Sequence, residues 1–150
     1  MIKPLLSLAG GLAGACALTL LHEITRKKDR DAPRMDLLGM SALASLIKKS
    51  GGTPPPNDQL FGITMAGDVA GNALYYSLAG IGPKRGVWMR GLVLGLAAGA
   101  GAVYLPEPLG LPTAPSNRTL ETKLLTIAFY TAGGLLAAAA MELMDARDKA

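Results

Sequence analysis

Residues 60–82 read LFGITMAGDVAGNALYYSLAGIG, and this stretch decides how the rest of the sequence is interpreted. A helix rises about 1.5 Å per residue, so a run of this length crosses the roughly 30 Å hydrocarbon core of a bilayer. The run nevertheless contains one acid, Asp68. A carboxyl group in hydrocarbon is costly unless it is shielded or used. We therefore expect the other segments to shield Asp68 or to use it.

Polar side chains recur at every fourth position of residues 60–82, and this spacing places them on one face of a helix. The predicted polar stripe consists of Thr64, Asp68, Asn72 and Tyr76, with Tyr75 beside it. Gly67 and Gly71 lie next to the stripe and allow another backbone to approach closely. We expect the stripe to face protein or water.

The composition indicates that lipid is the main solvent of this chain. Of 150 residues, 50% are hydrophobic, 17% are charged and 19 are glycine, and the mean hydropathy is +0.32. The net charge is +4, but the basic residues gather beside apolar runs and form no single stripe, which argues against a nucleic-acid partner. Cys16 is the only cysteine, so an intrachain disulfide is excluded, and we expect a buried free thiol.

Three further stretches are predicted to span the membrane, at about residues 4–22, 87–105 and 123–143. The first stretch has some features of a secretory signal, but the basic cluster that follows it favours a retained helix. The spans contain rows of small residues that are typical of helix packing surfaces in membranes. These glycines are Gly10, Gly14, Gly91, Gly95, Gly99, Gly133 and Gly134.

Residues 33–49 are predicted to form an amphipathic helix too short to cross a bilayer comfortably. We expect it to lie at the cytoplasmic interface, and packing against protein in a larger assembly is an equally good alternative. A proline-rich loop is predicted at residues 106–116. The predicted fold is thus an all-α integral membrane protein with four transmembrane helices, packed by small residues, and one interfacial helix.

The segment RKKDRDAPR, residues 26–34, follows the first span and favours a cytoplasmic position for that end. More basic residues fall on this side than on the side of the termini, so we expect both termini outside, in a bacterial inner membrane. The bias is small, and the inverted orientation stays open.

Charged residues at the two ends of the spans predict some contacts. Arg90 and Glu142 fall at the same level and are candidates for an ion pair. At the other end, six residues are expected to converge in a boundary cluster that either binds a lipid phosphate or a partner, or is simply solvated. They are His22, Glu23, Arg34, Asp36, Arg118 and Lys123.

Catalytic and metal-binding motifs are nearly absent. His22-Glu23 resembles the start of a zinc-protease helix, but His22 is the only histidine, which excludes a histidine-rich metal site within one chain. We find no phosphate-binding loop and no Gly-x-Ser-x-Gly nucleophile motif. We expect no cofactor and no metal.

Three functions are compatible with this sequence. The leading hypothesis is a membrane protein that acts by helix packing, as a homo-oligomer or an accessory subunit of a complex, with the bilayer and other membrane helices as partners. The alternative is a small oligomeric transporter or channel that uses Asp68 for proton or cation coupling. A lipid-modifying enzyme using His22, Glu23 and Asp68 ranks third, and we expect that the protein is not an enzyme.

Overall fold

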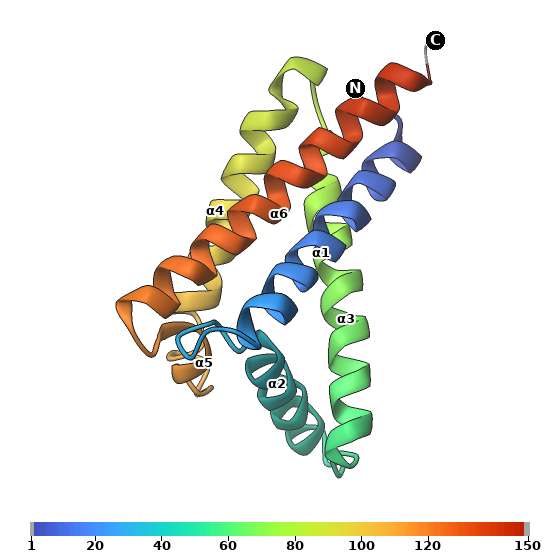
Figure 1. The fold of residues 1–150 in the computed structure, drawn as a ribbon. Coiled ribbons are helices and arrows are strands. Elements are labelled where there is room, and N and C mark those ends of the chain that lie inside the picture. Colours follow the sequence, from blue (N-terminus) through green and yellow to red (C-terminus); the bar gives the residue numbers. More distant parts are fainter. Residues whose placement is uncertain (1, 149–150) are drawn as a thin grey trace.

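The computed structural model describes residues 2–148, and the regular structure within this range is entirely helical, which confirms the predicted all-helical class. Figure 1 shows the helices as a bundle of rods with the two chain ends close together. The helices are α1 (Pro4–Arg26), α2 (Met35–Lys49), α3 (Asn57–Ser77), α4 (Val87–Tyr104), α5 (Ala114–Asn117) and α6 (Leu120–Arg147). Two short 3₁₀ turns, η1 (Leu78–Gly80) and η2 (Lys84–Gly86), lie between α3 and α4.

The long helices pack in the order α3, α1, α6, α4. Helix α6 contacts α1 on one side and α4 on the other, and α3 packs against the far side of α1. Helices α3 and α4 touch only sparsely, and α4 contacts η1 beyond the end of α3. Helix α2 packs beside α3 (Figure 1). The order leaves a lateral opening between α3 and α4.

Glycines bring α1, α4 and α6 into close contact. A Cβ atom built on Gly14 would lie 2.5 Å from the carbonyl oxygen of Gly133, and one on Gly91 would lie 2.5 Å from that of Gly134. Gly95 is equally tight, because a Cβ there would lie 2.6 Å from Thr131 Cα. Such distances are too short for any side chain, so the helix backbones themselves form these contacts.

The glycines of α3 differ from those of the other long helices. Gly67 and Gly71 are exposed, and a Cβ atom built on either would meet no other heavy atom within 4 Å. Ile63 and Leu74 on the same face are also exposed. We call this surface the outer face of α3.

The core lies where α1, α3 and α6 meet. Leu18, Tyr76 and Met141 are almost completely buried there. The expectation of a buried thiol at Cys16 is wrong, because that side chain is exposed. The buried face of α1 runs through Gly14, Ala15 and Leu18, and Cys16 lies off that face.

Three helical segments are long and apolar enough to cross a membrane, namely Pro4–Arg26, Lys84–Tyr104 and Leu120–Arg147. They correspond to three of the four predicted spans. Helix α3 does not meet the same criterion, since Asp68 and Asn72 lower its hydropathy. Many large apolar side chains are exposed on the bundle surface, with Leu5 and Leu120 at 77% and 70% exposure.

The two chain ends and the α3–α4 connection lie at one end of the bundle (Figure 1). Lys84 forms ion pairs with both carboxylate oxygens of Asp145, at 2.6 and 2.7 Å, and Lys3 pairs with Asp148. The opposite end holds α2, α5 and the connections beside them. The predicted loop at residues 106–116 is not fully irregular, because α5 begins at Ala114 with Pro115 in its first turn, where a proline is tolerated.

Candidate functional site

Asp68 lies between two hollows of different chemistry. The larger one, which we call the cleft, has a volume of about 540 Å³ and is lined by α2, α3, α4, residues 105–111 and Tyr130. The smaller one, which we call the chamber, has a volume of about 30 Å³ and is lined by α1, α2 and α3. Asp68 is on the wall of both. Met35 and Gly39 also line both hollows, and Asp68 is the polar one of these three shared residues.

The cleft is an open, mainly apolar groove with polar groups on one wall. Helix α4 contributes small residues, among them Ala98, Gly101 and Ala102, to its lining. Asp68, Asn72 and Tyr75 supply the polar wall from α3. Asn72 donates its amide N–H to Asp68 Oδ1 at 3.0 Å, and the Tyr75 hydroxyl donates to the Leu94 carbonyl at 3.1 Å.

Four buried polar atoms without a hydrogen-bond partner belong to residues that line the chamber. They are Thr19 Oγ1, His22 Nε2, Arg26 Nε and Thr64 Oγ1. Buried polar atoms normally have partners, because an unpaired one costs about 1–3 kcal/mol. Their concentration around one small space marks the chamber as a site for a polar guest.

His22 is the only histidine of the chain and is 8% exposed. Its Nδ1 atom lies 3.1 Å from the Leu18 carbonyl oxygen. A carbonyl oxygen accepts only, so this contact places the ring proton on Nδ1 and leaves a lone pair on Nε2. The ring is held in an edge contact with Phe129, with 5.2 Å between ring centroids. The chamber thus receives a hydrogen-bond acceptor from His22.

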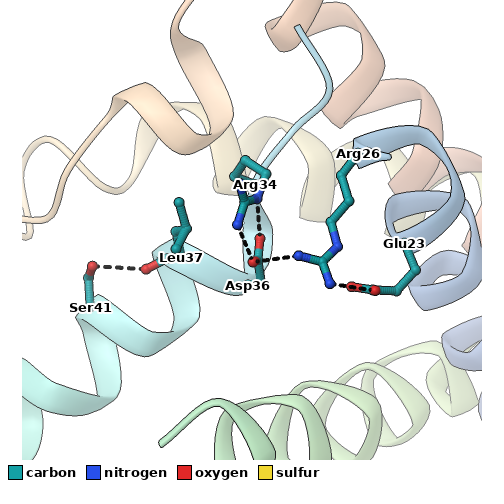
Figure 2. A network of polar contacts seen from close by, with 6 residues as sticks. All are labelled: Glu23, Arg26, Arg34, Asp36, Leu37 and Ser41. Carbon is teal, nitrogen blue, oxygen red and sulfur yellow. Dashed lines mark hydrogen bonds and ion pairs between the residues drawn. The ribbon is translucent and has the colours of Figure 1, made fainter. Parts of the chain in front are cut away.

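Charged residues from α1 and the start of α2 form a chain of ion pairs beside the chamber, shown in Figure 2. We call Glu23, Arg26, Asp36 and Arg34 the charge network. Arg26 donates to Glu23 at 2.6 Å and to Asp36 Oδ2 at 3.2 Å. Arg34 binds both oxygens of Asp36, at 2.9 and 2.7 Å, in the bidentate geometry that guanidinium groups favour. The network joins the end of α1 to the first turn of α2. One turn further along α2, the Ser41 hydroxyl donates to the Leu37 carbonyl.

The charge network shifts the ionisation of its members. Burial of Asp36 raises the pKa of its carboxyl group, but the hydrogen bonds and charge of Arg34, together with the charge of Arg26, outweigh burial and leave the pKa below its ordinary value of 3.8. The hydrogen bond to Asp36 raises the pKa of Arg34. Both groups are therefore charged at neutral pH.

The structure divides the predicted polar stripe among three environments. Thr64 faces the chamber, Asp68 borders both hollows, and Asn72 and Tyr75 line the cleft. Tyr76 is fully buried in the core, where its hydroxyl donates to the Tyr130 carbonyl at 2.8 Å.

The predicted boundary cluster is also divided. Glu23, Arg34 and Asp36 belong to the charge network, and His22 lies beside them in the chamber wall. Arg118 binds the Arg30 carbonyl and pairs with Asp31 at 3.3 Å. Lys123 lies 5.7 Å from the centroid of the Tyr104 ring. The six residues therefore do not form one binding surface.

Arg90 and Glu142 are directed to other partners. Arg90 donates to the carbonyl oxygens of Ala79 at 2.7 Å and Pro83 at 3.0 Å. Glu142 accepts a hydrogen bond from Trp88 at 2.6 Å. The ion pairs at this end of the bundle are instead those of Lys84 with Asp145 and Lys3 with Asp148.

Two residues of the site, Thr19 and Arg26, were not predicted from the sequence. Thr19, His22, Glu23 and Arg26 follow one another at spacings of three, one and three residues, which places them on one helical face. This periodicity is the available signal, but it crosses residue 22, where the predicted first span ends.

Within residues 2–148 no group of three or more histidine, cysteine, aspartate or glutamate side chains is arranged to hold a metal ion. Comparison with known proteins found no matching family model, no matching curated protein and no matching solved structure. The class of protein therefore rests on the fold and the site alone. The chain is a helical protein with three helices long and apolar enough to cross a membrane, and it has an acid between a cleft and a polar chamber.

Proposed function

We propose that the chain is an integral membrane protein of four spans, in which α3 and η1 together make the remaining crossing. Helix α3 and η1 pack antiparallel to α1. Gly80 of η1 adjoins Ser7 at one end, and the Phe61 ring centroid lies 6.0 Å from Arg26 Cζ at the other. The polar residues of α3 face the cleft, the chamber and the core. In this proposal both termini are outside a bacterial inner membrane, and α2 lies at the cytoplasmic boundary.

The function that the site supports best is binding of an amphiphile in the cleft, with Asp68 as its polar contact. One observation carries this proposal: Asp68 lies on the wall of a mainly apolar cleft, and no lysine or arginine of residues 2–148 forms an ion pair with it. A carboxyl group in such surroundings requires a cation, a hydrogen-bond donor or a proton. An amphiphile with an amine group supplies the first two.

The cleft also suits the apolar part of such a ligand. Its volume of about 540 Å³ falls within the range of ligand pockets, roughly 300–1,000 Å³. Small residues of α4 leave room for a hydrocarbon chain, and Leu38 and Leu109 add apolar contacts at the α2 end. The amine then donates to the Asp68 carboxylate beside the hydrogen bond that Asn72 already donates to Oδ1.

Binding of a fluorescent long-chain alkylamine to the protein in nanodiscs of zwitterionic lipid tests this function. Asp68→Asn removes a charged hydrogen bond, so we expect the affinity for the amine to fall about tenfold to a hundredfold. The affinity for the matching long-chain alcohol should change little. Asp58→Asn is the matched control, because Asp58 is an exposed acid in the first turn of the same helix.

A second variant distinguishes binding of the ligand's hydrocarbon chain from binding of its amine group. Ala98→Phe fills the cleft and should weaken binding of the amine and of the alcohol alike. If the amine binds Asp68→Asn as tightly as the original protein, the proposed role of Asp68 is wrong. The polar path of a transporter would use the same residue, but the buried Tyr76–Tyr130 contact favours binding over conduction.

Assembly with a second copy is the other candidate function, favoured by the outer face of α3. Glycines such as Gly14, Gly91 and Gly95 are occupied by contacts with α6, whereas Gly67 and Gly71 are open. Exposed Ile63 and Leu74 flank these two glycines. The same face on two copies suits a twofold interface with close backbone contact.

Native mass measurement in mild detergent tests this assembly. Gly67→Leu should convert dimers to monomers, whereas Val93→Leu, which adds bulk at an exposed position of α4, should leave dimers intact. A monomer at all concentrations, or a complex with a different protein, would contradict assembly of two copies through α3.

A further inference from the structure

We propose that the chamber binds a water molecule and that Asp68 exchanges its proton through this water with the aqueous side next to the charge network. This inference concerns the chamber, whereas the amphiphile concerns the cleft. It rests on the proposed membrane position of α3, but it does not require that any ligand binds.

The chamber has the size and the chemistry of a water site. Its volume of about 30 Å³ exceeds the roughly 10–15 Å³ that one water needs. A buried water makes two to four hydrogen bonds, and the chamber offers the unpaired oxygens of Thr19 and Thr64, the Nε2 acceptor of His22 and the Nε–H donor of Arg26. A hydrocarbon guest would leave all these atoms unpaired.

The position of the chamber determines the side from which protons arrive. Its lining includes Glu23 and Arg26, whose side chains are 27% and 24% exposed at the end of α1. In the opposite direction along α3, Tyr76 is fully buried and packs against α6. The route through the chamber thus leads from Asp68 to the charge network and stops short of the other end of the bundle.

The proton transfer is balanced within these groups. The Asp68 carboxyl group releases its proton to the chamber water as that water releases one of its own protons to the Glu23 carboxylate. Asp68 is left as a carboxylate, Glu23 becomes a carboxylic acid, and the water is regenerated. Because Glu23 is partly exposed, bulk water then removes its proton.

Titratable and charged groups from every helix around Asp68 influence this exchange. The α4 residues that line the cleft do not ionise. Ionisable groups come from α3 and α6 beside the cleft and from α1 and α2 beside the chamber. These groups are His22, Glu23, Arg26, Asp36, Tyr75, Tyr76 and Tyr130.

Labelling with dicyclohexylcarbodiimide in vesicles tests the route. This reagent enters the bilayer and modifies a carboxyl group in its protonated form, and intact mass with peptide mapping identifies modified Asp68. The full chain is reconstituted with the pH set separately on the two sides, and trypsin cleavage after Lys27 or Lys28 reports its orientation. Asp68→Asn serves as the blank.

We expect labelling of Asp68 to follow only the pH on the side of the charge network. Thr64→Val keeps the side-chain shape and removes one hydroxyl of the chamber, so labelling should respond about tenfold more slowly to a pH jump on that side. Thr131→Val is the control, because its hydroxyl donates to Ile127 in α6 outside the chamber. Labelling that follows the pH at the termini, or that ignores pH on both sides, would overturn the proposal. An unchanged response in Thr64→Val would overturn the role of the chamber water.

Discussion

The same substitution, glycine to alanine, should have opposite effects on the stability of two helices. In α4, a Cβ atom on Gly95 would lie 2.6 Å from Thr131 Cα, 2.7 Å from the Tyr130 carbonyl oxygen and 3.1 Å from that of Thr131. All three atoms belong to the backbone of α6. In α3, a Cβ atom on Gly67 would meet no heavy atom within 4 Å.

These distances set the expected magnitudes. An added methyl group in a tightly packed contact costs about 1–3 kcal/mol, and a helix backbone cannot turn aside as a flexible side chain can. Alanine in place of glycine returns about 0.5–1 kcal/mol through helix propensity. We therefore expect Gly95→Ala to lower the free energy of unfolding by about 2 kcal/mol. Gly67→Ala should raise it by up to about 1 kcal/mol.

Reversible unfolding by sodium dodecyl sulfate in mixed micelles measures both values at a low protein concentration, where the chain is monomeric. Gly99→Ala provides a replicate, since a Cβ atom there would lie 2.7 Å from Ile127 Cα. Equal or greater stability of Gly95→Ala would refute the close α4–α6 contact. A loss in Gly67→Ala as large as that in Gly95→Ala would refute the open outer face of α3.

Two further predictions concern single polar groups. The folded pKa of Asp36 lies below the ordinary value of 3.8, so its contribution to stability is complete above that pH and is lost as the pH falls through the folded pKa. Unfolding measured from pH 6 to about pH 2 should therefore show a smaller acid-induced loss in Asp36→Asn than in the original protein. Tyr76→Phe removes the hydroxyl that donates to Tyr130 and should lower the free energy of unfolding by about 0.5–1.5 kcal/mol, without altering the helical circular dichroism spectrum.

The positions of the helices follow from the sequence because apolar runs and prolines are local signals. Helices α1, α4 and α6 match three of the four predicted spans, and each observed helix includes most of its predicted range. Helix α1 continues to Arg26 because Arg26 pairs with Glu23 one turn earlier, so the helix outlasts its apolar run. Charges at the end of an apolar run therefore do not mark the end of a helix.

The division of the polar stripe has a geometric cause. Four residues turn a helix by about 400°, so a row of every fourth position drifts by about 40° per step. From Thr64 to Tyr76 the drift reaches about 120°, a third of a turn. Thr64 consequently faces the chamber while Tyr76 faces α6. The four-residue spacing therefore predicts correctly that the neighbours of Asp68 share its face. It does not hold over the whole stretch from Thr64 to Tyr76.

The partners of Arg90 show what a single sequence leaves open. Depth in the membrane placed Arg90 and Glu142 at one level, but depth gives no information on the direction of a side chain around its helix. The short turn η1 leaves the Ala79 carbonyl available, and Arg90 reaches it from the next helix. Arg90 therefore binds carbonyl oxygens before α4, and Glu142 binds Trp88.

The central position of α6 has a consequence for biosynthesis. Helices α1 and α4 both pack on α6, yet α6 is translated after them. Until α6 is made, the glycines of α1 and α4 that pack on it, among them Gly14, Gly91 and Gly95, have no partner in the nascent chain. The contacts of α3 with α1 and α2, and those of η1 with α1 and α4, can form earlier. Synthesis of the first helices and closure of the bundle are therefore separate events in time. A nascent chain halted before α6 would therefore expose the glycines of α1 and α4 that the complete bundle covers.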